Sequence, residues 1–367
     1  MISHASKVRL AQFDCLTALG DSASTHAALL RGEIGLRPTP VLGQKGGESV
    51  PLALLPGHDL DEATPPVWLD AVRKLVEPIK DLGWGSPRRP ICFASSNFGV
   101  GSLYSYQVTQ RPEAIQYGTP EGCVDWLRRE MGWGTHLAIF SHACVSSHIA
   151  LLHASRLVES EAADEVLIFS FDFLSPFVAG GFHALKILNA TMPAPYQNRD
   201  IGAIGLGDGA AYAVISKSRG EFEIPVQNVH NEMFHFTSNQ PAGAGFDALL
   251  KPLSHTGLKL WFKGHGTGTL EAGKLESHAS AKFFPNAPIV GWKGSLGHTL
   301  GSCGLVELAL TTRSLQTGIT PGTVGSANPT FESQVALTSF NNQSYDGALC
   351  TSNAFGGAHA AFLLRHV

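Results

Sequence analysis

The chain has 367 residues and a nearly balanced charge, with 26 lysines and arginines against 30 aspartates and glutamates. A net charge of −4 gives no basic surface of the kind that binds nucleic acid or an anionic membrane. No apolar run approaches the roughly 20 residues of a membrane-spanning helix, and the first residues lack the pattern of a signal peptide. The six cysteines show no C-x-x-C spacing, which argues against a zinc site or a disulfide framework. We therefore expect a cytoplasmic, core-rich enzyme or enzyme-like subunit with no nucleic-acid or membrane partner.

Two short apolar segments bracket a helical pattern in the first half of the chain. Residues 136–140 and 165–171 are rich in β-branched and aromatic side chains, which is typical of strands. Between them, residues 149–160 carry apolar side chains at helical spacing. This order predicts a βαβ unit and a parallel, buried sheet. A glycine-rich turn then leads into another buried strand within residues 201–215.

The second half repeats this alternation in pattern, though not in letters. Residues 258–264 and 287–294 each predict a strand followed by a loop. Residues 303–318 predict a helix that ends at Gly318. Each half therefore contains strand, turn and helix units, and a boundary between the halves is expected near residues 216–225.

Cys144 lies four residues after the first predicted strand and directly before the helical pattern, in SHACVSSHIALL. A thiol at a helix amino terminus is favoured as a thiolate by the unpaired N–H groups and the positive end of the dipole. A strand, a sharp turn and a helix are the general form of a nucleophile elbow. The alternative is a buried cysteine that packs as a small hydrophobic residue.

Two histidines follow predicted strands in glycine-rich loops of the second half. His265 lies in KGHGTGT, where glycines let the backbone approach a ligand, although a structural turn would also explain it. His298 lies in GWKGSLGHTLG, with Lys293 five residues before it and Glu307 nine residues after it. A buried lysine–glutamate pair would orient this histidine, or would be an ordinary ion pair.

Taken together and in this order, the motifs resemble the β-ketoacyl synthase family, in its elongating Cys-His-His branch. The resemblance rests on A-C-x-S-S at Cys144, G-H-G-T-G-T at His265, K-x-x-x-G-H-T from Lys293 to His298, and F-G-G at Phe355. It covers nearly the whole chain and includes residues 8–38, 198–215 and 318–332.

The resemblance implies an α/β, thiolase-like fold of two pseudo-duplicated halves in α-β-α-β-α layers. We assign residues 1–216 to the N-terminal half, which carries the nucleophile, and residues 217–367 to the C-terminal half, which carries both histidines. The family dimerises through a strand near the active site, and residues 165–171 are our candidate for that edge strand.

The reaction that the resemblance implies is decarboxylative Claisen condensation, in fatty acid or in polyketide or polyene biosynthesis. An acyl thioester on Cys144 is attacked by the enolate that forms when a malonyl-carrier protein loses carbon dioxide. His265 and His298 are the implied donors to the malonyl thioester carbonyl. The backbone N–H groups of Cys144 and Phe355 form the implied oxyanion hole.

The same resemblance assigns Lys293 and Glu307 to supporting positions behind the catalytic residues, and makes Phe355 a gate to the acyl pocket. The substrates are carried on the phosphopantetheine arm of an acyl carrier protein, so no metal or redox cofactor is expected. A homodimer is expected, and a heterodimer with a related ketosynthase-like subunit is the alternative.

The sequence also departs from the family pattern. The acid expected before the retained Glu276 is Gly273, residues 170–173 replace a G-G-x-E segment, and His359 replaces a closing asparagine. These departures indicate a specialised member and leave two alternatives open. One is a non-condensing acyltransferase on the same scaffold. The other is a chain-length-factor-like partner subunit, which the intact Cys144 disfavours.

Overall fold

The computed structural model describes residues 8–40, 48–62, 64–235 and 237–367. The first seven residues, where we expect no signal peptide, lie outside the described part of the chain. Twelve strands join in one mixed sheet that extends through the molecule. Within the described ranges, no helix has the length and apolar character needed to cross a bilayer.

The sheet consists of two half-sheets with the same strand pattern. The strands of the first are, in spatial order, β1 (Arg9–Thr17), β9 (Gly209–Ser216), β7 (Glu165–Asp172), β5 (Ile91–Ala94) and β6 (Ala138–Phe140). Those of the second are β10 (Phe222–Asn231), β17 (Ala358–His366), β16 (Gly347–Ala354), β11 (Leu260–Lys263), β12 (Pro288–Val290) and β14 (Gln334–Val335). In each half the first two pairings are antiparallel and the following ones are parallel. The fold is therefore pseudo-duplicated, as predicted.

The two half-sheets meet where β1 pairs antiparallel with β10, at Leu10 and Phe222. A short connection after Ser216 separates β9 from β10. Because the β1–β10 pairing makes one continuous sheet, the division of the chain after residue 216 stays a prediction.

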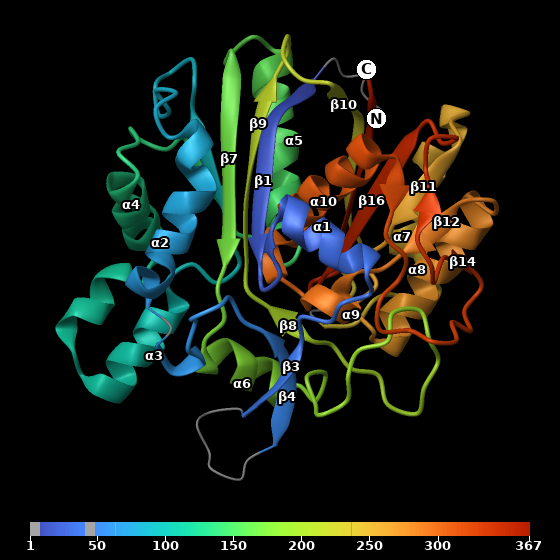
Figure 1. Ribbon diagram of the computed structural model, residues 1–367, viewed down its shortest axis with the longest axis horizontal. Coiled ribbons are helices and arrows are strands. Elements are labelled where there is room, and N and C mark those ends of the chain that lie inside the picture. The colour runs from blue at the N-terminus through green and yellow to red at the C-terminus, as the bar shows by residue number, and fades with distance from the viewer. Residues whose placement is uncertain (1–7, 41–47, 63, 236) are drawn as a thin grey trace.

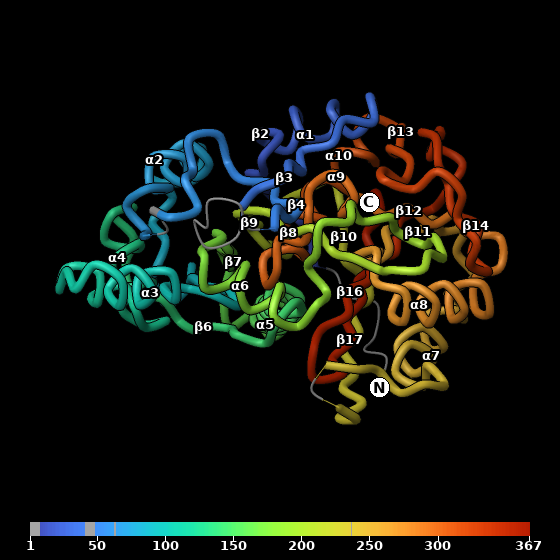
Figure 2. Tube along the Cα trace, turned by 90° about the horizontal axis from the view of Figure 1, so that it is seen from below, coloured from blue at the N-terminus to red at the C-terminus, as the bar shows by residue number. Residues whose placement is uncertain are grey.

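Helices lie between the half-sheets and on both outer faces, which confirms the α-β-α-β-α layering (Figure 1). The middle layer is α5 (Ser146–Glu159) with α10 (Cys303–Thr317), and both share one hydrophobic core with strands of each half. Figures 1 and 2 show the outer helices at opposite sides of the molecule. They are α2 (Pro65–Val76) and α4 (Pro120–Glu130) on the first half-sheet, and α7 (Ala244–Leu250) and α8 (Leu270–Phe283) on the second.

The smaller elements complete the chain around this frame. The helices are α1 (Ser22–Leu30), α3 (Val100–Thr109), α6 (Pro176–Ala184) and α9 (Lys293–Leu296), and a 3-10 turn, η5, covers Leu300–Ser302. The strands are β2 (Gly20–Asp21), β3 (Arg37–Pro40), β4 (Ser49–Ala53), β8 (Leu206–Gly207), β13 (Ile319–Thr320) and β15 (Phe340–Asn341).

Both central helices were predicted from periodicity, and α10 ends at Gly318, whose φ of 71° is the left-handed conformation that favours glycine. The prediction that residues 165–171 form the edge strand is wrong. Strand β7 lies between β9 and β5, and all eight of its residues are buried. The edge of the first half-sheet is β6, which pairs with β5 on its inner side. A continuous apolar run indicates a strand that is covered on both faces, and this property does not reveal its neighbours.

Candidate active site

Cys144 lies in the sharp turn between β6 and α5, as predicted. Ala143, directly before it, has a φ of 46°, a backbone conformation that is unusual for a residue with a side chain. The hydroxyl of Ser146 stabilises this turn, because it accepts from the His142 N–H at 2.8 Å and donates to the Ala143 carbonyl at 2.7 Å. Cys144 is half-buried and lines a pocket.

His298 is in direct contact with the nucleophile, with Nε2 3.0 Å from Cys144 Sγ. The other ring nitrogen, Nδ1, accepts from the backbone N–H of Leu300 at 3.1 Å. A neutral imidazole carries one proton, so this contact assigns the proton to Nε2. His298 therefore presents an N–H group to the sulfur.

His265 lies beside His298, with ring centroids 5.0 Å apart and an interplanar angle of 85°. Its loop is held by the Glu276 carboxylate, which accepts from the His265 N–H at 2.7 Å and the Gly266 N–H at 3.1 Å. The ring Nδ1 is 3.2 Å from Ser352 Oγ. Glu276, the acid that the sequence retains from the family pattern, thus fixes the turn that carries His265.

The predicted ion pair between Lys293 and Glu307 is present and buried. The structure adds a third member, because Lys263 Nζ lies 2.6 Å from the same Glu307 oxygen. Lys293 also donates to the His265 carbonyl at 2.9 Å. One carboxylate between two lysines leaves this buried cluster, which we call the lysine–glutamate triad, with one net positive charge.

Burial and the charge of the triad together favour the neutral form of both histidines. Burial lowers the pKa values of His265 and His298 far below the usual range, and the charge of Lys293 lowers them further. Neutral imidazoles donate hydrogen bonds without releasing a proton to their partner. Burial also raises the pKa of the Cys144 thiol, and this effect exceeds the lowering by the charge of Lys293 and by a backbone hydrogen bond. Burial therefore opposes the thiolate that the position before a helix favours.

The pocket above these residues has a volume of about 300 Å³. Its lining includes Cys144, His265, His298 and Phe355. The Phe355 side chain is about one third exposed (37%) and stacks on Phe182 at 6.0 Å, a position that suits the predicted gate.

Two of the departures from the family pattern have structural counterparts. Gly273 leaves its position on α8 without an acid, while Glu271, one half-turn earlier, lines the pocket and accepts from the Asn239 N–H at 3.1 Å. In the segment that replaces G-G-x-E, Asp172 supplies a fully buried carboxylate at the end of β7. The sequence showed only that this segment replaces G-G-x-E, and no role for Asp172 was predicted from it.

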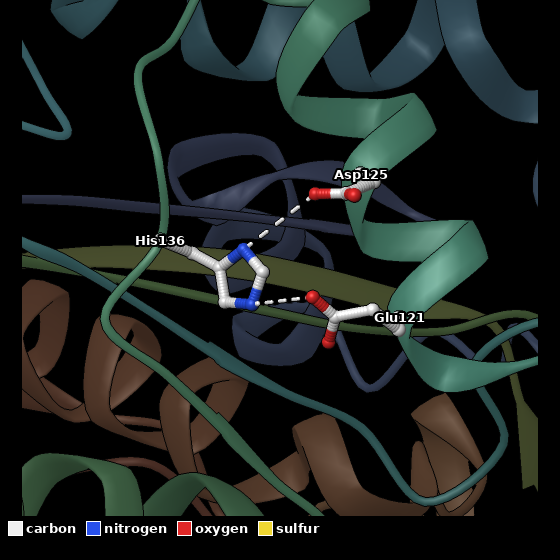
Figure 3. A group of neighbouring side chains, drawn as sticks. All are labelled: Glu121, Asp125 and His136. Atoms are coloured by element: carbon white, nitrogen blue, oxygen red, sulfur yellow. Dashed lines mark ion pairs between the residues drawn. The ribbon is translucent and has the colours of Figure 1, made fainter.

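A separate group of polar side chains lies away from the pocket, on α4 and the segment before β6 (Figure 3). His136 Nε2 is 3.4 Å from Glu121, and its Nδ1 is 3.8 Å from Asp125. A metal ion takes only one nitrogen of an imidazole, whereas these carboxylates face opposite nitrogens. Asp125 also accepts from Arg128 at 2.7 Å. The arrangement is that of ion pairs around a ring that joins two elements.

Comparison with known proteins finds similarity to ketosynthases in sequence and in fold. Residues 237–327 match the family model described as β-ketoacyl synthase, C-terminal domain. The 3-oxoacyl-[acyl-carrier-protein] synthase 2 of Vibrio cholerae is 26% identical over 261 residues, which cover 64% of this chain and 63% of that protein. The tetracenomycin polyketide synthase ketoacyl synthase alpha subunit of Streptomyces glaucescens is 26% identical over 279 residues, which cover 69% and 65%. The chain therefore aligns with less than two thirds of the length of these curated relatives.

Solved structures match over the whole length. A chain of the complex between the ketosynthase ApeO and its chain length factor ApeC from Xenorhabdus doucetiae superposes with a TM-score of 0.83 at 21% identity, covering 99% of this chain and 98% of that one. A chain of AntDE:AntF, a type II polyketide acyl carrier protein in complex with its ketosynthase, also gives 0.83, at 14% identity and with 99% and 100% covered. The fold is thus that of the thiolase-like ketosynthases. In sequence and in fold the chain is therefore similar to the β-ketoacyl synthases.

Proposed function

We propose that the protein is a β-ketoacyl synthase that joins a malonyl unit to an acyl group held on Cys144. The observation that carries the proposal is the meeting of one thiol and two neutral imidazoles at the end of a single pocket. A nucleophile that stores the acyl group and donors that stabilise an enolate are the groups this condensation needs.

In the first step, the sulfur of Cys144 attacks the acyl thioester of a carrier protein. The N–H of His298, 3.0 Å away, stabilises the negative charge on the sulfur as the proton leaves. The backbone N–H groups of Cys144 and Phe355 receive the negative charge on the thioester oxygen. The phosphopantetheine thiol departs with the proton, and the acyl group remains on Cys144.

In the second step, the malonyl thioester loses carbon dioxide and its carbonyl oxygen becomes an enolate. His298 donates from Nε2. His265 donates from Nε2 when its Nδ1 accepts a hydrogen bond from the Ser352 hydroxyl. The Cys144 carbonyl then accepts a hydrogen bond from the Cys303 thiol, 3.3 Å away. The enolate carbon attacks the acyl carbon, a carbon–carbon bond forms, and the sulfur of Cys144 is released.

Intact-protein mass spectrometry with a panel of acyl carrier proteins and malonyl carrier protein tests this function. We expect an acyl adduct that is absent in Cys144→Ala, and release of a β-ketoacyl product two carbons longer. An adduct that is never extended would indicate the non-condensing acyltransferase. No adduct from any donor would indicate the non-catalytic partner subunit.

The partners follow from the same proposal. Solved relatives include a ketosynthase with its chain length factor and a ketosynthase with an acyl carrier protein. We propose that this chain likewise receives its substrates from an acyl carrier protein and pairs with a second ketosynthase-like subunit, either identical or related. Six free cysteines suit a reducing compartment, which supports a cytoplasmic enzyme.

A further inference from the structure

Asp172 is a fully buried carboxylate for which the condensation steps above have no use. It lies at the end of β7, where Oδ1 faces the loop after β5. There it accepts from the Ser95 hydroxyl at 2.8 Å, the Ser96 N–H at 3.0 Å and the Asn97 N–H at 2.9 Å. The Ser96 hydroxyl donates to the same oxygen at 3.3 Å, so four donors on one oxygen hold this loop in place.

The second oxygen of Asp172 faces the other side of the site. Oδ2 accepts from the Ser302 N–H at 2.9 Å, in the turn η5. The first residue of the same turn, Leu300, donates to His298 Nδ1 at 3.1 Å. The carboxylate is therefore connected to the catalytic histidine through a single turn of backbone, and His298 is in contact with Cys144.

The contact between the two loops is close. A Cβ added at Gly301 would lie 2.7 Å from the Ser96 nitrogen and 3.0 Å from Asp172 Oδ2. Leu300 has a φ of 53°, a conformation that the surrounding contacts must hold. The turn that orients His298 therefore depends on contacts made by neighbouring segments.

We propose that Asp172 is a positioning residue: its carboxylate ties η5 to the Ser95–Asn97 loop and so holds His298 Nε2 at the sulfur of Cys144. The inference rests on the proposed function only where it concerns condensation, since the geometry of the thiol and the imidazole is independent of the substrate.

The negative charge of Asp172 and its positioning of His298 act on the reactivity of the Cys144 thiol in opposite directions. An experiment can therefore separate these two roles. The negative charge of Asp172 is one of the groups that raise the pKa of Cys144, after burial and Cys303. If Asp172 acted only as a charge, its removal would favour the thiolate and speed alkylation. If it positions His298, its removal withdraws the N–H donor from the sulfur and slows alkylation.

The experiment measures the rate of Cys144 alkylation by iodoacetamide at pH 8. This pH lies above the pKa of Asp172, which burial raises to about 7 against the lowering effect of its hydrogen bonds. The other five cysteines are buried, and Cys144→Ala gives the background. In Asp172→Asn we expect the alkylation rate to fall by up to about ten-fold, as for the loss of a hydrogen bond to a charged group. Turnover should fall while the KM for malonyl carrier protein stays within about two-fold.

Glu165→Gln is the matched control, because Glu165 is a buried carboxylate at the opposite end of the same strand, paired with Arg89 at 2.6 Å. It should lower the melting temperature without changing the alkylation rate. Gly301→Ala separates the two loops while keeping the carboxylate, and should slow alkylation as Asp172→Asn does; it decides the question if Asp172→Asn does not fold.

Alkylation of Asp172→Asn at the parental rate or faster overturns the proposal. If the variants slow alkylation as expected but the parent neither condenses nor decarboxylates, the positioning role stands and the proposed function fails.

Discussion

Removing the carboxylate of the lysine–glutamate triad should cost more stability than any exposed ion pair contributes. In Glu307→Gln, Lys263 and Lys293 would face each other in a buried site with no counter-charge. Leaving a buried charge without its partner costs about 3–5 kcal/mol. A chain of 367 residues has an unfolding entropy of about 0.8 kcal/mol/K at the midpoint, from roughly 2 cal/mol/K per residue. The melting temperature of the variant should therefore be about 4–6 °C lower.

Differential scanning calorimetry at pH 7 measures this shift, with Glu130→Gln as the control. Glu130 pairs with Arg73 at 2.7 Å on the surface, so its loss should lower the melting temperature by about 1 °C or less. In Glu307→Gln one lysine should release its proton, and Lys263 is the candidate because burial lowers its pKa. The folded variant then binds fewer protons than the unfolded chain, so its stability deficit should shrink between pH 7 and pH 9. A melting temperature within about 1 °C of the parent at pH 7 would refute this reasoning.

Three further predictions address the chemistry. Cys144→Gln should stop condensation and raise malonyl decarboxylation, because the amide mimics the acylated cysteine; a rate no higher than the parent's, measured as carbon dioxide release, contradicts the roles given to the histidines. Ser352→Ala should lower decarboxylation in that Cys144→Gln background about five-fold, since His265 Nδ1 loses its hydroxyl partner; an unchanged rate would show that this hydroxyl does not set the ring proton. Burial, and then Lys293, keep the pKa values of His265 and His298 low, so both are neutral when folded but become charged when unfolded below about pH 6.5. The unfolded chain then binds more protons, so the melting temperature should fall between pH 6.5 and 5, and less steeply in His298→Gln; equal slopes would contradict the assignment.

Local sequence patterns were sufficient to predict the two central helices. The helical spacing of apolar residues predicted α5 and α10, and a glycine after the last periodic residue predicted where α10 ends. Local patterns did not predict which strands are neighbours in the sheet. Residues 136–140 and 165–171 are consecutive strands of the predicted unit, yet β5, from residues 91–94, lies between them. Strand order depends on pairings far apart in the chain, so the wrong edge was chosen.

The site divides in the same way. Cys144, His265 and His298 stand in recognisable motifs, and the fold brings them together. Lys263 and Asp172 stand in segments that predict strands, where one charged residue at a strand end is unremarkable. Their importance comes from burial and from partners that are distant in sequence: the donors to Asp172 come from positions 77 and 130 residues away. Spacing along the chain carries no trace of such contacts.

The buried charges also suit the proposed reaction, in which an enolate must form without being protonated early. A protonated imidazole would give its proton to the enolate carbon and end the reaction before a carbon–carbon bond forms. The triad has one more lysine than carboxylate, and it touches the His265 loop through Lys293. Its net positive charge disfavours a second positive charge on either ring, and favours a negative charge on an oxygen between them. The same buried charge therefore adds to the effect of burial in keeping the donors neutral, and it favours the intermediate of the proposed reaction.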